Sequence, residues 1–181
     1  MRTKAASAIL LVLTLPGCRV DSPPLTAPDS PRFASRPDAA VVAAARPVHG
    51  QCAVTFTVVP SAPPVVRQID TGTCLLSHLG ASTTTGAQTI NFATLTQNTE
   101  RTFTAANGDV LRATAVGTSK PGAEPGTIDF DAMLTVIGGT GRFANATGQV
   151  HDWGTANVVT REVSFALDGW LAYDASDRSN R

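Results

Sequence analysis

Two carboxylates, two residues apart, are the first candidates for chemistry in this sequence. Asp129 and Asp131 stand in a run where apolar and polar residues alternate, so both would lie on one face of a β-strand. Carboxylates that share a pocket can act as a general acid and a general base. Burying two carboxylates without partners is costly, however, and the apolar residues between them need the core. The pattern therefore favours a solvent-facing pair.

The remaining polar candidates are scattered along the chain. His78 and His151 could bind a metal ion or carry a proton, but no third ligand stands at a recognisable spacing. Structural or surface positions are therefore favoured for both, and no metal site is predicted. Arg112 and Glu162 are lone charges within predicted strands, where each could cap a pocket or pair across a sheet. No catalytic or ligand-binding residue can be assigned from these patterns.

One pattern imitates a cofactor site. Gly139, Gly141 and Ala144 have the spacing of a dinucleotide-binding fingerprint, but that motif needs a following helix and a second parallel strand. Gly148 interrupts any such helix, so no nucleotide and no other cofactor is predicted. The formal net charge is zero and the charges are dispersed, which excludes an electrostatic stripe for nucleic acid. The aromatic residues Trp153, Trp170 and Tyr173 are expected to pack at the ends of the fold.

The N-terminus reads as a targeting segment over residues 1–17. Two basic residues precede an apolar run from Ala5 to Leu15, which is shorter than the roughly 20 residues of a membrane span. The small residue Gly17 followed by Cys18 resembles the lipobox of bacterial lipoproteins. This resemblance implies cleavage before Cys18, lipidation of Cys18, and a protein held on a membrane of the cell envelope, with Arg19 favouring the outer membrane. The alternative is an ordinary secretory signal with an incidental cysteine.

Two further cysteines then predict a disulfide. Residues 51–59 and 65–79 read as strands joined by a proline-containing turn, and folding them as a hairpin brings Cys52 beside residues 73 and 74. Paired cysteines in an exported protein favour a structural Cys52–Cys74 bridge. A reactive thiol pair is the alternative, but no CxxC spacing supports it.

The elements that position these residues are strands and turns. Hydrophobic residues make up 43% of the 181 residues, which is enough to fill one core, and no helical period is evident beyond the N-terminus. Residues 18–49 are rich in proline and alanine and are expected to form a disordered linker. The folded domain is predicted over residues 50–173, followed by a polar tail at 174–181.

A strand and a glycine-dense corner form the centre of the predicted domain. Residues 127–137 alternate, and three glycines between 138 and 141 end the strand, after which Phe143 can anchor the chain in a core. Asn107-Gly108 predicts a tight hairpin with positive φ at both residues. Roughly seven to nine strands with short connections are typical of an antiparallel barrel or sandwich. Closure would remove exposed sheet edges, so the fold expected is an all-β, closed antiparallel barrel of about eight strands.

Two segments carry a resemblance to a known family. Residues 134–148 (LTVIGGTGRFANATG) resemble the glycine-rich signature of allene oxide cyclases and dirigent-like proteins, and residues 73–83 (TCLLSHLGAST) are similar to a strand of their bacterial members. The resemblance implies an antiparallel barrel with an apolar interior, often dimeric or trimeric in the plant members. The plant cyclases rearrange an unsaturated epoxide, and dirigent proteins direct the coupling of phenolic radicals or quinone methides.

Three functions follow as hypotheses. The first is a lipid-anchored envelope protein, not clearly catalytic, whose barrel binds a small apolar ligand or serves as an interaction module. The second is an isomerase or cyclase acting on a hydrophobic substrate in the barrel. The third is a purely structural surface protein. An open cavity with one or two polar groups would favour a carrier or an enzyme, whereas an interior filled by Phe130, Phe165 and their neighbours would favour an interaction module.

Overall fold

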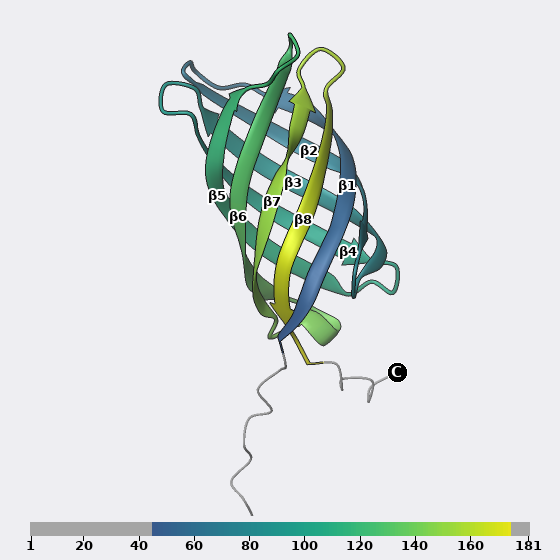
Figure 1. The fold of residues 1–181 in the computed structure, drawn as a ribbon. Coiled ribbons are helices and arrows are strands. Elements are labelled where there is room, and N and C mark those ends of the chain that lie inside the picture. The colour runs from purple at the N-terminus through teal and green to yellow at the C-terminus, as the bar shows by residue number, and fades with distance from the viewer. Residues whose placement is uncertain (1–44, 175–181) are drawn as a thin grey trace, which may run out of the picture. The chain divides into compact units, whose positions relative to one another are not determined.

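The computed structural model describes residues 45–174, which form a closed antiparallel barrel of eight strands (Figure 1). The all-β barrel predicted from the sequence is therefore confirmed. The signal segment, Cys18 and residues 175–181 lie outside the described residues. No helix within the described range is long and apolar enough to cross a membrane. The strands are β1 Ala45–Val59, β2 Val65–Leu76, β3 Gly80–Asn91, β4 Thr96–Ala105, β5 Val110–Pro121, β6 Thr127–Gly139, β7 Thr147–Asn157 and β8 Glu162–Ala172.

Each strand pairs with the next in the chain, and β1 closes the barrel by pairing with β8. Because Ala45 is paired with Ala172, both ends of the barrel's chain lie at one end, which we call the closed end (Figure 1). The hairpins that join β1 to β2, β3 to β4, β5 to β6 and β7 to β8 lie at the opposite end, which we call the mouth. Closure leaves no unpaired sheet edge.

The first strand begins earlier than the sequence suggested. Residues 45–49 belong to β1, although they were expected in the linker. Val48 points inward and is buried, and the pairing of this segment with β8 satisfies its backbone. Tertiary pairing thus recruits a proline-containing segment whose local composition indicates a linker.

Apolar side chains fill the closed half of the interior. Leu134 and Leu171 are 1% and 0% exposed, and their neighbours on facing strands are similarly buried. The 3-10 helix η1 (Gly141–Phe143) follows β6 and brings Phe143, 0% exposed, into this core. Gly138 and Gly141 have φ of 106° and 55°, conformations that suit glycine, so the predicted glycine corner and its aromatic anchor are confirmed.

The Asn107-Gly108 turn differs from the prediction. Only Gly108 has positive φ there, at 87°. The Asn107 side chain instead accepts a hydrogen bond from the Asp109 backbone N–H at 3.2 Å and donates one to the Asp109 carboxylate at 2.7 Å. The loop from 106 to 109 is longer than a two-residue hairpin turn, so a single left-handed residue suffices.

Candidate functional site

A cavity of about 250 Å³ occupies the mouth half of the barrel. Its lining comes from the mouth ends of the strands, including Val58 of β1, Ile90 of β3 and Ala156 of β7. Phe130 lies against Phe165 in an edge-to-face contact with ring centroids 6.3 Å apart, and these two rings leave the cavity open. The barrel is therefore plugged in its closed half and hollow in its mouth half.

Three charged side chains point into this interior. Asp70 on β2, Arg101 on β4 and Asp152 on β7 are 2%, 7% and 4% exposed, respectively, and all three line the cavity. Alternation along each strand puts them inside, because their buried neighbours on the same strands are two residues away. Charged residues are almost never this buried unless they are paired or functional.

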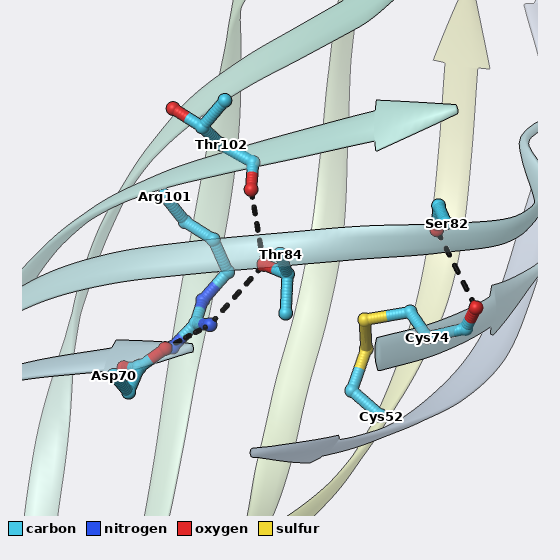
Figure 2. Close-up of a disulfide and its surroundings, with 7 residues drawn as sticks. All are labelled: Cys52, Asp70, Cys74, Ser82, Thr84, Arg101 and Thr102. Atoms are coloured by element: carbon cyan, nitrogen blue, oxygen red, sulfur yellow. Dashed lines mark hydrogen bonds and ion pairs between the residues drawn. A yellow bond between two sulfur atoms is a disulfide. The ribbon is translucent and has the colours of Figure 1, made fainter. Parts of the chain in front are cut away.

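Asp70 and Arg101 form a bidentate ion pair (Figure 2). Arg101 donates from Nη1 to Oδ1 at 2.9 Å and from Nη2 to Oδ2 at 3.0 Å. The strand between them carries Gly86 in the same cross-strand row, where an added Cβ would lie 2.6 Å from Asp70 Oδ2. Glycine thus leaves the space that the ion pair occupies.

The surroundings of Arg101 hold its guanidinium in place. Arg101 Nη1 lies 3.5 Å from Thr84 Oγ1, which itself donates to the Thr102 carbonyl at 3.0 Å (Figure 2). The guanidinium carbon stacks 4.7 Å from the centre of the Phe165 ring. Arg101 Nε has no hydrogen-bond partner and is buried, so one donor of this fixed group remains available.

Asp152 is the unpaired charge of the cavity. Its buried Oδ1 has no hydrogen-bond partner. Burial raises the pKa of Asp152 from 3.8 to about 7; the nearby positive charge of Arg101 lowers it and the negative charge of Asp70 raises it. This carboxyl can therefore both donate and accept a proton near neutral pH.

Uncharged amides make a polar wall beside these charges. Gln68 donates to the Gln88 side chain, Gln88 donates to the Gln97 side chain at 2.8 Å, and Ser119 donates to the same Gln97 oxygen at 2.8 Å. Together with Phe56, Ile90 and Phe130 on the apolar part of the lining, the cavity combines a hydrophobic volume with a few fixed polar groups. That combination is typical of small-molecule sites.

The candidates chosen from the sequence lie on the outer wall instead. Asp129 accepts a hydrogen bond from Thr155 at 2.8 Å, and Asp131 lies 3.0 Å from His151 Nε2 with 69% of its side chain exposed. The solvent-facing reading of the two carboxylates therefore holds. His151 also stacks on Trp153, with ring centroids 4.5 Å apart.

The other candidates do not line the cavity either. His78 lies in the β2–β3 turn at the closed end, with Nε2 2.9 Å from the Pro47 carbonyl oxygen. Tyr173 is buried there against Phe143, as expected for an aromatic residue at a barrel end. Arg112, Glu162 and Trp170 are exposed on the wall. No group of three metal-ligating residues occurs among the residues that the structure describes.

The disulfide joins Cys52 and Cys74, which stand directly opposite each other on β1 and β2 (Figure 2). Both cysteines are buried, and they belong to the apolar core. Closing a loop with a sequence separation of 22 residues is worth about 3 kcal/mol in the chain-entropy account. The bridge therefore stabilises the sheet and takes no part in the cavity.

Sequence reasoning missed all three charged residues of the cavity. Alternation was used to place apolar residues such as Phe130 in the core, but it was not applied to the polar residues of the other strands. Counting every second residue from the buried Cys74 back along β2 reaches Asp70, and the same count from Phe103 along β4 reaches Arg101. This count along the strands would have predicted the inward position of Asp70 and Arg101 from the sequence.

Three larger hollows, of about 320, 430 and 670 Å³, lie on the outer wall, and the smallest of them lies beside Asp129 and Asp131. Their outward-facing lining mixes threonines and other small residues with longer side chains such as Arg67 and Glu100. These hollows are open to water along the sheet, so they lack the enclosure of the interior cavity.

Comparisons with known proteins add a distant structural similarity. No protein-family model and no curated protein matches the chain. Among solved structures, the chain is similar to the pterocarpan synthase dirigent protein GePTS1, with a TM-score of 0.45 and 15% sequence identity, over 73% of this chain and 93% of that chain. No activity or site residue is transferred on a similarity of this level.

Proposed function

We propose that this protein is a binding protein of the cell envelope whose barrel takes up one small molecule through its mouth. The apolar body of the ligand would lie among the aromatic and aliphatic side chains, and a polar group would meet Asp152 and Arg101. The observation that carries this proposal is the buried Asp152 oxygen without a partner inside an open cavity. An interior evolved only for packing gains nothing from such a group, because burying it is unfavourable.

The proposal includes a lipid anchor at Cys18. The chain enters the barrel at Ala45, at the closed end, so a tether would be attached at the end opposite the mouth. The 27 residues from Cys18 to Ala45 can extend to at most ~90 Å. An anchored barrel would thus have access to ligands both near the membrane and away from it.

Filling the cavity should abolish binding. Ala156 lines the cavity and is half-buried, so an indole ring in Ala156→Trp would occupy the apolar volume. We expect toluene to bind the wild-type protein and to bind this variant at least about tenfold more weakly, measured by NMR titration. Ala87→Trp is the matched control, because Ala87 is exposed on the outer wall. A wild-type protein that does not bind toluene would contradict the proposal.

Removing the anchoring thiol should release the protein from the membrane. We expect Cys18→Ser to move the protein from the membrane fraction to the soluble fraction when it is expressed in a bacterium that processes lipoproteins. The measurement is fractionation with immunoblotting, and the buried pair Cys52 and Cys74 stays intact as an internal reference for folding. Equal membrane association of both proteins would refute the anchor.

Acid–base isomerisation is a second candidate function. It is favoured by the pKa of about 7 for Asp152, since a carboxyl with this value can shuttle a proton at neutral pH. Arg101 Nε could stabilise charge that develops on a substrate oxygen. Product formation from candidate epoxides or phenolics by the wild-type protein, lost in Asp152→Asn, would support catalysis. Binding without turnover would leave the carrier as the function.

A further inference from the structure

The charges of the cavity do not balance. Its described lining contains two carboxylates, Asp70 and Asp152, and one buried cation, Arg101. The amide and hydroxyl groups that complete its polar lining are neutral. A second cation, Arg161, lies at the mouth, where its exposed side chain is screened by water. With both carboxylates ionised, the buried interior carries a net charge of −1.

The geometry decides which of the two carboxylates carries the excess negative charge. Both oxygens of Asp70 accept hydrogen bonds from Arg101, so this pair is locally neutral. Asp152 lies within the electrostatic influence of Arg101, but its Oδ1 has no partner. A ligand anion would therefore meet a guanidinium already held by Asp70 and a second carboxylate beside it. A ligand cation would complete the charge balance.

We propose that the cavity selects a small amine whose ammonium group binds the Asp152 carboxylate and whose apolar body fills the volume toward the mouth. This inference rests on the proposed function, since it specifies the class of ligand for the same cavity. An ammonium group has donors for Asp152 Oδ1 and for the free lone pairs of the amide wall. Phe56 and Phe130, which line the cavity, supply aromatic rings that can interact with a cation.

Proton binding competes with amine binding at Asp152. The groups that act on this carboxyl are Arg101 from β4, Asp70 from β2, His151 from its own strand and Asp131 from β6. Below its pKa of about 7 the carboxyl is protonated and offers no negative charge. We therefore expect amine affinity to fall about tenfold per pH unit below 7 and to level off above it, while a primary amine stays protonated up to about pH 9.

Three probes of one shape separate the possible ligand charges. We would titrate the full-length protein with 2-phenylethylamine, 2-phenylethanol and phenylacetate at pH 8, using calorimetry or NMR. A phenyl ring fits a cavity of about 250 Å³, since engineered cavities of roughly 150 Å³ bind benzene. We expect the amine to bind about 10- to 100-fold more tightly than the alcohol, and phenylacetate to bind most weakly.

Two variants test whether Asp152 is the group that binds the ammonium. Asp152→Asn keeps the size of the side chain and should bring the amine and the alcohol to within about threefold of each other, with thermal melting to verify that the variant is folded. Glu100→Gln removes an exposed carboxylate on the outer wall that does not act on Asp152, and it should leave the preference unchanged.

The outcomes separate this inference from the proposed function. Equal binding of amine and alcohol, tighter binding of phenylacetate, or retention of the amine preference in Asp152→Asn would overturn the inference while leaving a binding cavity in place. Failure of all three probes to bind would overturn the inference together with the proposed function, because the phenyl ring should enter the cavity whatever its substituent.

Discussion

Replacing Asp152 with asparagine should stabilise the barrel by up to about 4 kcal/mol at pH 8. The reason is the difference between the pKa of about 7 in the folded protein and the ordinary 3.8 of an aspartate. Each pKa unit corresponds to 1.36 kcal/mol of differential stability, and the asparagine side chain has no charge to bury.

The sign of the pH dependence follows from proton counting. Between pH 4 and 7 the folded protein holds a proton on Asp152 that the unfolded chain has already lost. Stability contributed at this site therefore decreases as pH rises through that window and is constant above it. Asp152→Asn should lack this decrease, so the two proteins should have similar stability near pH 4 and diverge toward pH 8.

Denaturant unfolding at pH 4.5, 6, 7 and 8 would measure this difference. Asp131→Asn is the matched control, since its carboxylate is exposed on the same region of the sheet and its loss should change stability by less than about 0.5 kcal/mol. If the free energies of unfolding of the wild-type protein and of Asp152→Asn differed by the same amount at every pH, burial would not raise the pKa of Asp152.

Removing Arg101 should have the opposite effect: we expect Arg101→Met to lower the free energy of unfolding by about 3–5 kcal/mol. This change leaves Asp70, 2% exposed, without its partner and leaves two buried carboxylates near one another. Breaking a buried ion pair from one side is strongly destabilising, because the remaining charge has lost both water and its counter-ion.

Replacing the other partner of the ion pair, Asp70, should destabilise the protein less than replacing Arg101. In Asp70→Asn the guanidinium of Arg101 still has Asp152 as a negative neighbour, so the buried cation is not left without compensation. Replacing both partners, as in Asp70→Leu with Arg101→Met, should recover much of the loss of Arg101→Met, since apolar replacements of buried pairs are often tolerated. Denaturant unfolding at pH 7 would measure the free energy of unfolding of Arg101→Met, of Asp70→Asn and of the double variant.

Arg112→Met on the outer wall of the neighbouring strand β5 is the control for the loss of a positive charge. Arg112 is exposed, so we expect a change within about 0.5 kcal/mol. If Arg101→Met were destabilised by no more than this control, the ion pair would contribute nothing to the fold, and Arg101 would be retained for another reason.

Together these results would show that the charged groups of the cavity are retained although they reduce the free energy of unfolding. Asp152 would lower the stability of the folded barrel, whereas Arg101 would be required to compensate the buried charge of Asp70. Groups with strongly perturbed pKa values cluster at functional sites, and improving stability there usually harms function. A stabilised Asp152→Asn that no longer discriminates an amine from an alcohol would be the combined signature.

Local signals were enough for the strands and their links. All eight strands alternate or are bounded by turn residues, and the glycine corner with Phe143 and the facing cysteines were predicted correctly. Local signals were insufficient where another strand decides the outcome. Residues 45–49 look like linker until β8 pairs with them, and Asn107 has negative φ because the loop length, rather than the dipeptide, sets the turn.

The sequence by itself determined antiparallel strands, their disulfide and the outward position of Asp129 and Asp131, because each depends on a period of two or on a turn close by in the chain. Only the tertiary structure placed Asp70, Gly86 and Arg101 in one cross-strand row and left Asp152 unpaired in the same cavity. These residues come from four strands, so their proximity depends on the registers of several ladders and on barrel closure. No single segment of the chain contains that information.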